Sequence, residues 1–265
     1  MTDKNKLLEV RNLTMDFGGL RAIDGVDLDI FEGEIVALIG PNGAGKTTFF
    51  NCVTGIYEPT CGDVLIHPPG GVSRPINGMK PNRITALGMA RTFQNIRLFP
   101  AMTVLENVMI GRHCRTATTI IDAIFHSRRA LREARETVDQ SYQLLERVGL
   151  AASADEFASN LAYGAQRRLE IARALATDPF LLLLDEPAAG MNPQETCELD
   201  ELIVRIRAQE QVAILLIEHD MKLVMNISDR IYVMEYGKEI AQGTPREIRE
   251  NPKVIEAYLG EEVNA

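Results

Sequence analysis

The residues from Gly40 to Thr48 have the composition and spacing of a loop that binds phosphate groups. They read GPNGAGKTT, which fits the pattern G-x-x-x-x-G-K-[ST], and they directly follow the apolar stretch VALI. Glycines let the backbone N–H groups of such a loop curl around phosphate oxygens, and the helix that follows presents its positively polarised N-terminus. The loop comprises Gly40, Pro41, Asn42, Gly43, Ala44, Gly45, Lys46, Thr47 and Thr48.

Two side chains of this loop have separate chemical tasks. The ammonium of Lys46 places a positive charge on the β- and γ-phosphates, and the hydroxyl of Thr47 is a ligand for Mg²⁺. The alternative is a glycine-rich turn that fits the pattern by chance. The strand expected before the loop and the helix expected after it favour the phosphate site.

A second candidate for chemistry is the stretch FLLLLDE, residues 180–186, which ends in two carboxylates. In open α/β sheets, ligands bind at the carboxyl ends of the parallel strands. Asp185 is therefore expected to hold Mg²⁺ through water, and Glu186 to polarise the water that attacks a phosphate. Alone, an Asp-Glu pair after a strand is often only a polar strand end. Together with the phosphate loop it favours a nucleotide hydrolase.

Composition limits the class of protein. The chain has 265 residues, 46% hydrophobic and 25% charged, which suits a globular protein of one domain with a large insertion. Its net charge of -9 disfavours a protein that grips nucleic-acid backbones. No apolar run reaches the ~18 residues that span a bilayer, and the N-terminus lacks a signal sequence. We expect a cytoplasmic protein.

The cysteines and histidines give little sign of a metal centre of their own. None of the four cysteines has C-x-x-C spacing, and in the cytoplasm they would stay reduced. His113 and Cys114 are adjacent, but a zinc site needs a second pair of ligands, so we do not expect one.

The elements that must position these residues follow from hydrophobic patterning. Alternation over Leu7–Phe17 and Ala22–Ile30 predicts antiparallel strands that lead into a buried strand at Ile35–Ile39. Phe180–Leu184 and Ala213–Ile217 are continuously apolar, which is typical of central strands in a mostly parallel sheet.

The middle of the chain, from about Val104 to Gly149, has helical rather than strand character. Residues 120–150 carry apolar residues at helical spacing, and Gly149 is expected to end this helix. The mixed charges there predict a solvated helix face rather than a patch for anionic surfaces. These charges are Arg128, Arg129, Arg132, Glu133, Arg135 and Glu136.

The C-terminal part contains clear signals for a turn and for two helix starts. Ile231–Glu235 and Glu239–Gln242, joined by Tyr236-Gly237, predict a hairpin. The sequence Thr244-Pro-Arg-Glu247 is a capping box with proline at the first helical position, and Asn251-Pro252 starts a last helix that we expect to stop at Gly260.

These motifs together resemble the ATP-binding cassette (ABC) ATPases along essentially the whole chain. The resemblance implies that Gln94, in RTFQNIRLFP, senses the γ-phosphate and Mg²⁺, and that His219, in LLIEHDM, contacts the γ-phosphate. It also implies that Phe17 stacks on adenine, with a core strand residue as the alternative. Asn192 stands where the family usually has aspartate, which puts charge-based communication across a dimer in doubt.

The family holds each ATP between the phosphate loop of one subunit and a signature segment, usually LSGGQ, of another. Here that segment is Leu161, Ala162, Tyr163, Gly164 and Ala165. Alanines replace the serine and the glutamine, and each hydrogen bond lost to a charged phosphate costs about 1.5–3 kcal/mol. Gly164 and the N–H groups of the following helix remain. We therefore expect a working ATPase with a weakened or asymmetric partner contact.

A narrower resemblance is to the ATP-binding subunits of bacterial branched-chain amino-acid importers. It rests on Tyr163, the long insertion after Gly111, EPAAGMNP, IEHDMKLVM and the ending NPKVIEAYLG. It implies import of leucine, isoleucine and valine with ATP and Mg²⁺ as cofactors. The implied partners are a second ABC ATPase, homo- or heteromeric, two membrane permease subunits and, indirectly, a periplasmic solute-binding protein. The chain would then lie on the cytoplasmic face of the inner membrane.

The resemblance further implies the fold and a division of labour. The expected fold is the α/β P-loop NTPase fold of ABC ATPases, with a mixed-sheet RecA-like core, an antiparallel β lobe and a helical lobe. The core would span about 1–93 and 173–245, the helical subdomain about 94–172 and the C-terminal helices about 244–260. In an importer, Gln94 and Phe99–Val108 would transmit closure of the ATPase pair to the permease.

Other functions remain open from the sequence. The solute could be urea or another small molecule, because the ATPase does not touch it. A soluble cassette ATPase acting on nucleic acid would show a long coiled coil or a basic face, and neither is visible. A scaffold ATPase for cofactor assembly or lipid extraction would lack the insertion and the AYLG ending.

Overall fold

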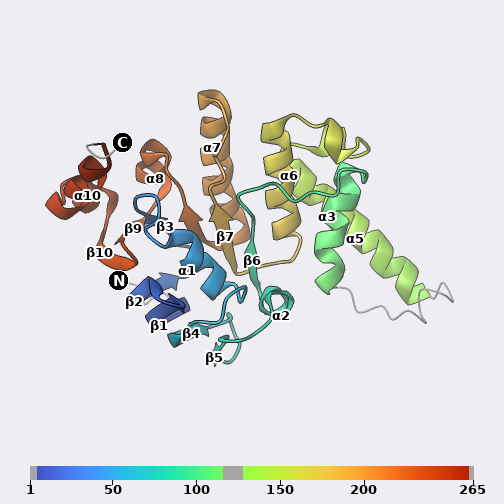
Figure 1. Ribbon diagram of the computed structural model, residues 1–265. Helices are drawn as coiled ribbons and strands as arrows, with labels where there is room; N and C mark the ends of the chain where they lie inside the picture. The colour runs from blue at the N-terminus through green and yellow to red at the C-terminus, as the bar shows by residue number, and fades with distance from the viewer. Residues whose placement is uncertain (1–4, 116–127, 263–265) are drawn as a thin grey trace. The chain divides into compact units, whose positions relative to one another are not determined.

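A computed structural model describes residues 5–115 and 128–262 of the chain (Figure 1). The chain forms two compact units. The first joins Met1–Arg91 with Phe180–Ala265, and the second is Thr92–Pro179. The first unit contains two β-sheets with their helices, whereas the helices α3, α5 and α6 belong to the second.

The smaller sheet is antiparallel and has the strand order β2-β1-β4-β5. Its strands are β1 (Lys6–Phe17), β2 (Leu20–Phe31), β4 (Cys61–Ile66) and β5 (Arg74–Pro75). The two predicted N-terminal strands are confirmed, although they start one and two residues earlier than the patterning indicated. A tight turn at Gly18-Gly19 joins them, with Gly18 at a φ of 58°.

The larger sheet has six strands in the order β10-β9-β3-β8-β7-β6. All neighbouring pairs are parallel except the β9–β10 hairpin, so the predicted mostly parallel sheet and the predicted hairpin are confirmed. The strands are β3 (Ile35–Ile39), β6 (Met89–Arg91), β7 (Leu181–Asp185), β8 (Ala213–Ile217), β9 (Arg230–Glu235) and β10 (Lys238–Gly243).

Both faces of this sheet are buried, which explains the unbroken apolar runs of its central strands. In β3, Val36 and Leu38 join a core shared with the antiparallel sheet. Ala37 and Ile39 point the other way, into a core with residues of the C-terminal helices such as Val224 and Ile248. The carboxyl ends of β3, β7 and β8 therefore emerge side by side from a fixed platform.

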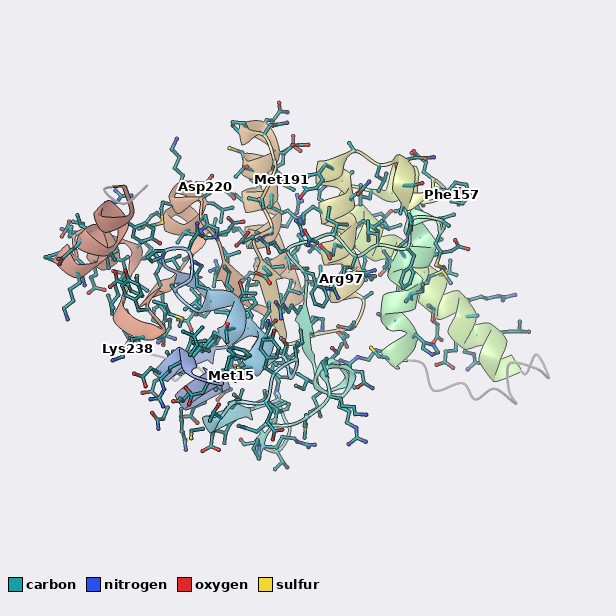
Figure 2. The ribbon with its side chains drawn as sticks, in the orientation of Figure 1. Met15, Arg97, Phe157, Met191, Asp220 and Lys238 are labelled. Atoms are coloured by element: carbon teal, nitrogen blue, oxygen red, sulfur yellow. The ribbon has the colours of Figure 1, made fainter. Side chains whose placement is uncertain are left out.

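Most helices of the first unit begin after a capping side chain or with a proline in the first turn. They are α1 (Lys46–Val53), α2 (Pro81–Ala86), α7 (Pro193–Glu210), α8 (Met221–Ile227), α9 (Pro245–Arg249) and α10 (Pro252–Glu262). The predicted capping box of Thr244 and Glu247 is present. Asp220, labelled in Figure 2, caps α8 by accepting bonds from the N–H groups of Lys222 and Leu223 at 2.8 and 3.3 Å.

The predicted end of the last helix at Gly260 is wrong, because α10 continues to Glu262. A glycine inside a helix costs only ~1 kcal/mol relative to alanine. The two glutamates that follow are good helix formers, so one glycine near the end does not terminate the helix.

The second unit is helical, as predicted. It contains α3 (Val104–Arg112), η1 (His113–Arg115), α5 (Arg128–Arg147), η2 (Ala151–Ser153), η3 (Ala158–Asn160) and α6 (Tyr163–Leu175). Gly149, at a φ of 71°, follows the end of α5. Arg132, Arg135 and Glu136 are exposed, in line with the predicted solvated face, whereas residues 116–127 of the predicted helical stretch lie outside the described ranges.

Helices α3 and α6 pack closely at Gly111. A Cβ added there would collide with the carbonyl oxygen of Arg173 and lie 2.9 Å from the Cβ of Ala176. The start of α3 is fixed by a capping box of Thr103 and Glu106, which our sequence interpretation missed. No helix in the described parts of the chain is long and apolar enough to cross a membrane.

Candidate functional site

The phosphate-type loop follows β3 directly and is shaped by glycines. Gly40 has a φ of 151° and Gly45 a φ of 100°, a region that L-residues rarely adopt. A Cβ on Gly40 would collide with the carbonyl oxygen of Met234, and one on Gly45 would lie 2.7 Å from the carbonyl oxygen of Ala22. Close backbone packing therefore demands glycine at both positions and fixes the curl of the loop before α1.

Lys46 is held inside this loop. Its ammonium donates to the carbonyl oxygens of Gly40 and Pro41 at 2.6 and 2.8 Å, and the residue is only 6% exposed. Gly237 donates its N–H to the carbonyl of Ala44 at 3.0 Å, which ties the loop to the β9–β10 turn. These contacts fix the charge of Lys46 at the loop.

Asp185 ends β7 as a buried carboxylate, 3% exposed. Its Oδ2 accepts a bond of 2.7 Å from Nη2 of Arg91, the last residue of β6. Both side chains are almost completely buried. A carboxylate removed from water requires such a partner.

Glu186 and His219 meet at the ends of β7 and β8. Nε2 of His219 and Oε1 of Glu186 are 2.8 Å apart, with 45% and 14% of the respective side chains exposed. Glu186 has a φ of 47°, so a non-glycine residue is held in the left-handed region. Such strain persists only where the surroundings over-determine it, and it is frequent at functional sites.

Glu218, the residue before His219, bonds the backbone near both Glu186 and His219. Its Oε1 accepts from the N–H of Ala188 at 2.7 Å, and its Oε2 accepts from the N–H of His219 at 3.0 Å. Burial raises the pKa of Glu218, and the backbone N–H bonds oppose this effect. One side chain thereby joins the end of β8 to the loop after Glu186.

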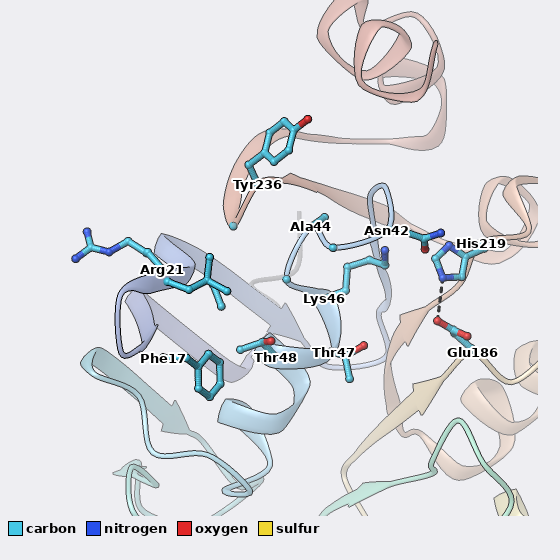
Figure 3. A pocket seen from close by; sticks show the side chains of 15 residues that line it. Phe17, Arg21, Asn42, Ala44, Lys46, Thr47, Thr48, Glu186, His219 and Tyr236 are labelled. Carbon is cyan, nitrogen blue, oxygen red and sulfur yellow. Dashed lines mark hydrogen bonds and ion pairs between the residues drawn. The ribbon is translucent and has the colours of Figure 1, made fainter. Parts of the chain in front are cut away.

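One pocket of about 610 Å³ brings most of the predicted first-unit residues together (Figure 3). Gly40, Pro41 and Asp185 do not line it, and all three residues are buried. The lining residues predicted from the sequence are Phe17, Asn42, Gly43, Ala44, Gly45, Lys46, Thr47, Thr48, Glu186 and His219.

Two aromatic side chains stand at different sides of this pocket. Phe17 is 42% exposed and packs edge-on against Tyr57, with ring centroids 5.3 Å apart. The alternative interpretation of Phe17 as a core residue is therefore wrong. Tyr236, which the sequence marked only as part of a turn, is 85% exposed and lines the same pocket (Figure 3). Either ring offers a flat apolar face to a planar ligand.

The second unit holds the other predicted site residues. Ala162 is the N-cap of α6. Its side chain makes no hydrogen bond to the N–H groups in the first turn of the helix. Tyr163 is exposed, whereas Gly164 is buried. The structure thus places the segment Leu161–Ala165 at a helix N-terminus, as the sequence predicted.

Arg167 connects this segment to Gln94 within the second unit. It is completely buried and donates to the carbonyl oxygens of Phe93 and Gln94 at 2.7 and 2.8 Å. It also bonds the hydroxyl of Tyr163 at 3.2 Å and the carboxylate of Glu170 at 2.9 Å. The side chain of Gln94 itself is exposed.

Asn192, the departure from the usual aspartate, caps α7. Its Oδ1 accepts from the N–H groups of Gln194 and Glu195 at 3.0 Å each, and Glu195 returns a bond to the N–H of Asn192. Asparagine and aspartate cap helices about equally well. The replacement therefore keeps the helix start and removes only the charge.

Our sequence interpretation missed Arg91, Arg167, Glu218 and Tyr236. The sequence carried a signal for one of them, Arg167. Arg167 lies on the same helical stripe as the buried Ile171 and Ala174, where a charge needs a partner. Arg91 directly follows two buried residues of a short strand, but nothing local indicates which carboxylate it meets.

Comparison with known proteins identifies the class. The family model described as ABC transporter matches residues 23–189, and one described as branched-chain amino acid ATP-binding cassette transporter matches residues 238–264. The chain therefore belongs to the ABC transporter family. As a member of this family it is an ABC-type ATPase that binds nucleotide, and the expected fold is confirmed.

Within the family, the chain is similar along nearly its whole length to ATP-binding proteins of branched-chain amino acid transport. It is 53% identical to the high-affinity branched-chain amino acid transport ATP-binding protein LivG of Salmonella typhimurium, over 96% of this chain and 98% of the relative. It is 51% identical to BraF, a protein of the same description from Pseudomonas aeruginosa, with the same coverage.

Solved structures agree with this grouping. The ADP conformation of MJ1267, an ATP-binding cassette of an ABC transporter, has a TM-score of 0.82 and 31% identity. That likeness covers 97% of this chain and 99% of the other. The sequence-based recognition of the family is confirmed.

Proposed function

We propose that the chain is the ATP-hydrolysing subunit of an importer for the branched-chain amino acids leucine, isoleucine and valine. The observation that carries the ATPase part is the contact between Glu186 and His219 in the pocket lined by the phosphate loop. The relatives named for branched-chain amino acid transport support the solute. Urea or another small solute is the alternative, since nothing in the pocket selects a transported molecule.

In this proposal the first unit holds the nucleotide. The loop Gly40–Thr48 wraps the phosphates with its N–H groups, and Lys46 neutralises them. Phe17 stacks on the adenine, with Tyr57 packed against its edge. Tyr236 is a second candidate for the base, since it lines the same pocket.

Glu186 orients and polarises the water that attacks the γ-phosphate. Its backbone strain and its bond to His219 fix the direction of the carboxylate. His219 then contacts the γ-phosphate from β8, and Glu218 holds the backbone on which His219 stands. Phosphoryl transfer depends mainly on such positioning and on charge stabilisation.

Thr47, Asp185 and Gln94 would hold Mg²⁺ together with the nucleotide. Hydroxyl, carboxylate and amide oxygens are ligands that this ion accepts, usually as one or two protein groups beside substrate phosphates. The described residues contain no cluster of three or more His, Cys, Asp or Glu that could hold a metal ion. When bound, the ion would neutralise charge that develops on the phosphates.

A second ATPase subunit completes the site through its signature segment. In this chain the corresponding segment is Leu161–Ala165, where Gly164 permits close approach and the start of α6 offers N–H groups. The alanines at 162 and 165 remove two polar contacts, so a heteromeric pair with unequal sites is a natural arrangement. Two permease subunits would anchor the pair at the cytoplasmic face of the membrane, and a periplasmic binding protein would deliver the solute to them.

The first test is the steady-state ATPase rate of the purified chain against its own concentration, beside Glu186→Gln. A rate that rises faster than linearly, and that the variant loses, is the expected result for a homodimer. If the ATPase rate stays near zero at every concentration, the same measurement is made on the complex with a second ATPase and the permeases. Absence of activity there as well would refute the proposal.

The solute needs its own test. Cells that lack the gene should lose high-affinity uptake of labelled leucine, isoleucine and valine and regain it with the intact chain but not with Glu186→Gln. If these cells take up the three amino acids normally but lose uptake of urea, the proposed solute is wrong and urea is the transported molecule.

A further inference from the structure

The guanidinium of Arg91 joins the two elements that make the nucleotide site. Besides the 2.7 Å bond to Oδ2 of Asp185, its Nη1 donates to Oδ1 of Asn51 at 2.8 Å and to Oγ1 of Thr54 at 3.0 Å. Asn51 lies in α1, the helix that follows the phosphate loop, and Thr54 is its C-cap. One side chain thus connects β7 to the far end of α1.

The Arg91 contacts are buried and closely packed, which indicates a specific interaction and not a chance surface contact. The Arg91 side chain is 8% exposed and that of Asp185 is 4% exposed, so both charges have left water. The ring of Phe50, another α1 residue, lies 5.4 Å from the guanidinium carbon. The Thr54 hydroxyl donates to the carbonyl of Phe50 at 2.6 Å, which turns its oxygen toward Arg91. All contacts lie within the first unit.

We propose that Arg91 is a positioning residue for Asp185: it fixes the carboxylate in register with the phosphate loop and thereby prepares it to support Mg²⁺ on the nucleotide. This inference rests on the proposed role of Asp185. A carboxylate that reaches a metal through water must point in one direction, and holding Oδ2 sets the direction of Oδ1. The planar fork of arginine can bond the carboxylate and the α1 acceptors at once, whereas a lysine ammonium would have to give up one of these bonds.

Arg91 contacts the far end of α1, whereas the phosphate loop at the other end is held by its own bonds, such as those of Lys46 to Gly40 and Pro41. Loss of Arg91 should therefore disturb the carboxylate of Asp185 more than it disturbs the loop that wraps the phosphates.

The test measures binding without turnover. The full-length chain with Glu186→Gln is titrated with a fluorescent ATP analogue, once in EDTA and once in saturating Mg²⁺. The dissociation constant in EDTA divided by that in Mg²⁺ gives the factor by which the metal tightens nucleotide binding, and this ratio measures the coupling between metal and nucleotide. Arg91→Met should lower this ratio about tenfold while the dissociation constant in EDTA changes less than about twofold.

Three further variants make the result specific. Asn51→Ala removes an anchor on α1 but no charge, and it should produce part of the same loss, non-additively with Arg91→Met. Arg91→Lys should recover only part of the ratio. Arg207→Met is the matched control, because Arg207 forms a partly exposed ion pair with Asp229 in the same unit, away from the nucleotide pocket.

An unchanged ratio in folded Arg91→Met, even with a lower Tm, would show a purely structural role and overturn the inference. A higher ratio would show that Arg91 competes with the metal and would overturn it as well. If Arg91→Met does not fold, unchanged ratios in both Arg91→Lys and Asn51→Ala overturn it. Failure of the proposed function looks different: the parent protein itself would bind no nucleotide or show no effect of Mg²⁺.

Discussion

Replacing Arg167 by methionine should destabilise the helical unit strongly. The arginine is completely buried and bonds two backbone carbonyls, the Tyr163 hydroxyl and the carboxylate of Glu170. Glu170 is 1% exposed, so the variant leaves a buried negative charge without its main partner. Removing one partner of a buried ion pair costs about 3–5 kcal/mol. Methionine fills part of the volume, so we expect a loss near that range and not beyond it.

The dependence on pH follows from the position of Glu170. Burial raises the pKa of its carboxyl group, and Arg167 opposes this effect. Without the arginine the pKa rises further, and the folded state prefers the protonated carboxyl. The penalty is therefore complete above the folded pKa and decreases as the pH falls through it. We expect a larger loss at pH ~8 than at pH ~5.5.

Hydrogen exchange of the α6 amides and urea unfolding followed by circular dichroism measure this loss. Arg132→Met, on the exposed face of α5, should change the free energy of unfolding by less than about 0.5 kcal/mol. The double variant Arg167→Met with Glu170→Gln should regain at least about 1 kcal/mol, because the unpaired charge is gone. A single-variant loss below about 1 kcal/mol, or no gain in the double variant, would refute the reasoning.

Three further predictions follow from other sites. Burial raises the pKa of Asp200 from an ordinary value of 3.8 to about 6, so its ionised form destabilises the fold fully above that pH, and the effect decreases as the pH falls from about 6 toward 3.8. Asp200→Asn should therefore raise Tm at pH ~7.5 more than at pH ~4.5, and equal shifts at both, or the same pattern in the exposed control Glu201→Gln, would contradict this. Gly111→Ala should destabilise by about 1–3 kcal/mol in urea unfolding, because its Cβ meets the carbonyl of Arg173; a gain, as helix propensity alone predicts, would show that α3 and α6 can separate. Phe17→Ala should weaken binding of an ATP analogue about tenfold, worth ~1.4 kcal/mol, while Phe17→Tyr keeps it; equal affinities would give the adenine contact to another ring.

The fold was predictable where short-range chemistry decides it. The loop Gly40–Thr48 is recognisable because backbone curvature and phosphate binding both demand fixed residues at fixed spacing. The strands β3, β7 and β8 are recognisable because a sheet covered on both faces needs unbroken apolar runs. The capping box of Thr244 and Glu247 lies within four residues and is confirmed.

Other features were beyond reach of local patterns. The three-residue strand β6 is too short to show a period, and the end of α10 at Glu262 depends on small differences in propensity around Gly260. The exposure of Phe17 depends on the ring of Tyr57, a residue that no motif connects with it.

The sequence by itself determined the family, the phosphate loop, the buried strands β3, β7 and β8, and the starts of the helices α1, α9 and α10. Each depends on neighbouring residues or on recurring spacing, which the linear chain carries directly. Only the tertiary structure decided that Arg91 bonds Asp185, 94 positions away, and that Arg167 bonds the carbonyls of Phe93 and Gln94, 74 and 73 positions away. A buried charge announces that it needs a partner, but which partner it finds depends on how the strands and helices bring distant segments together.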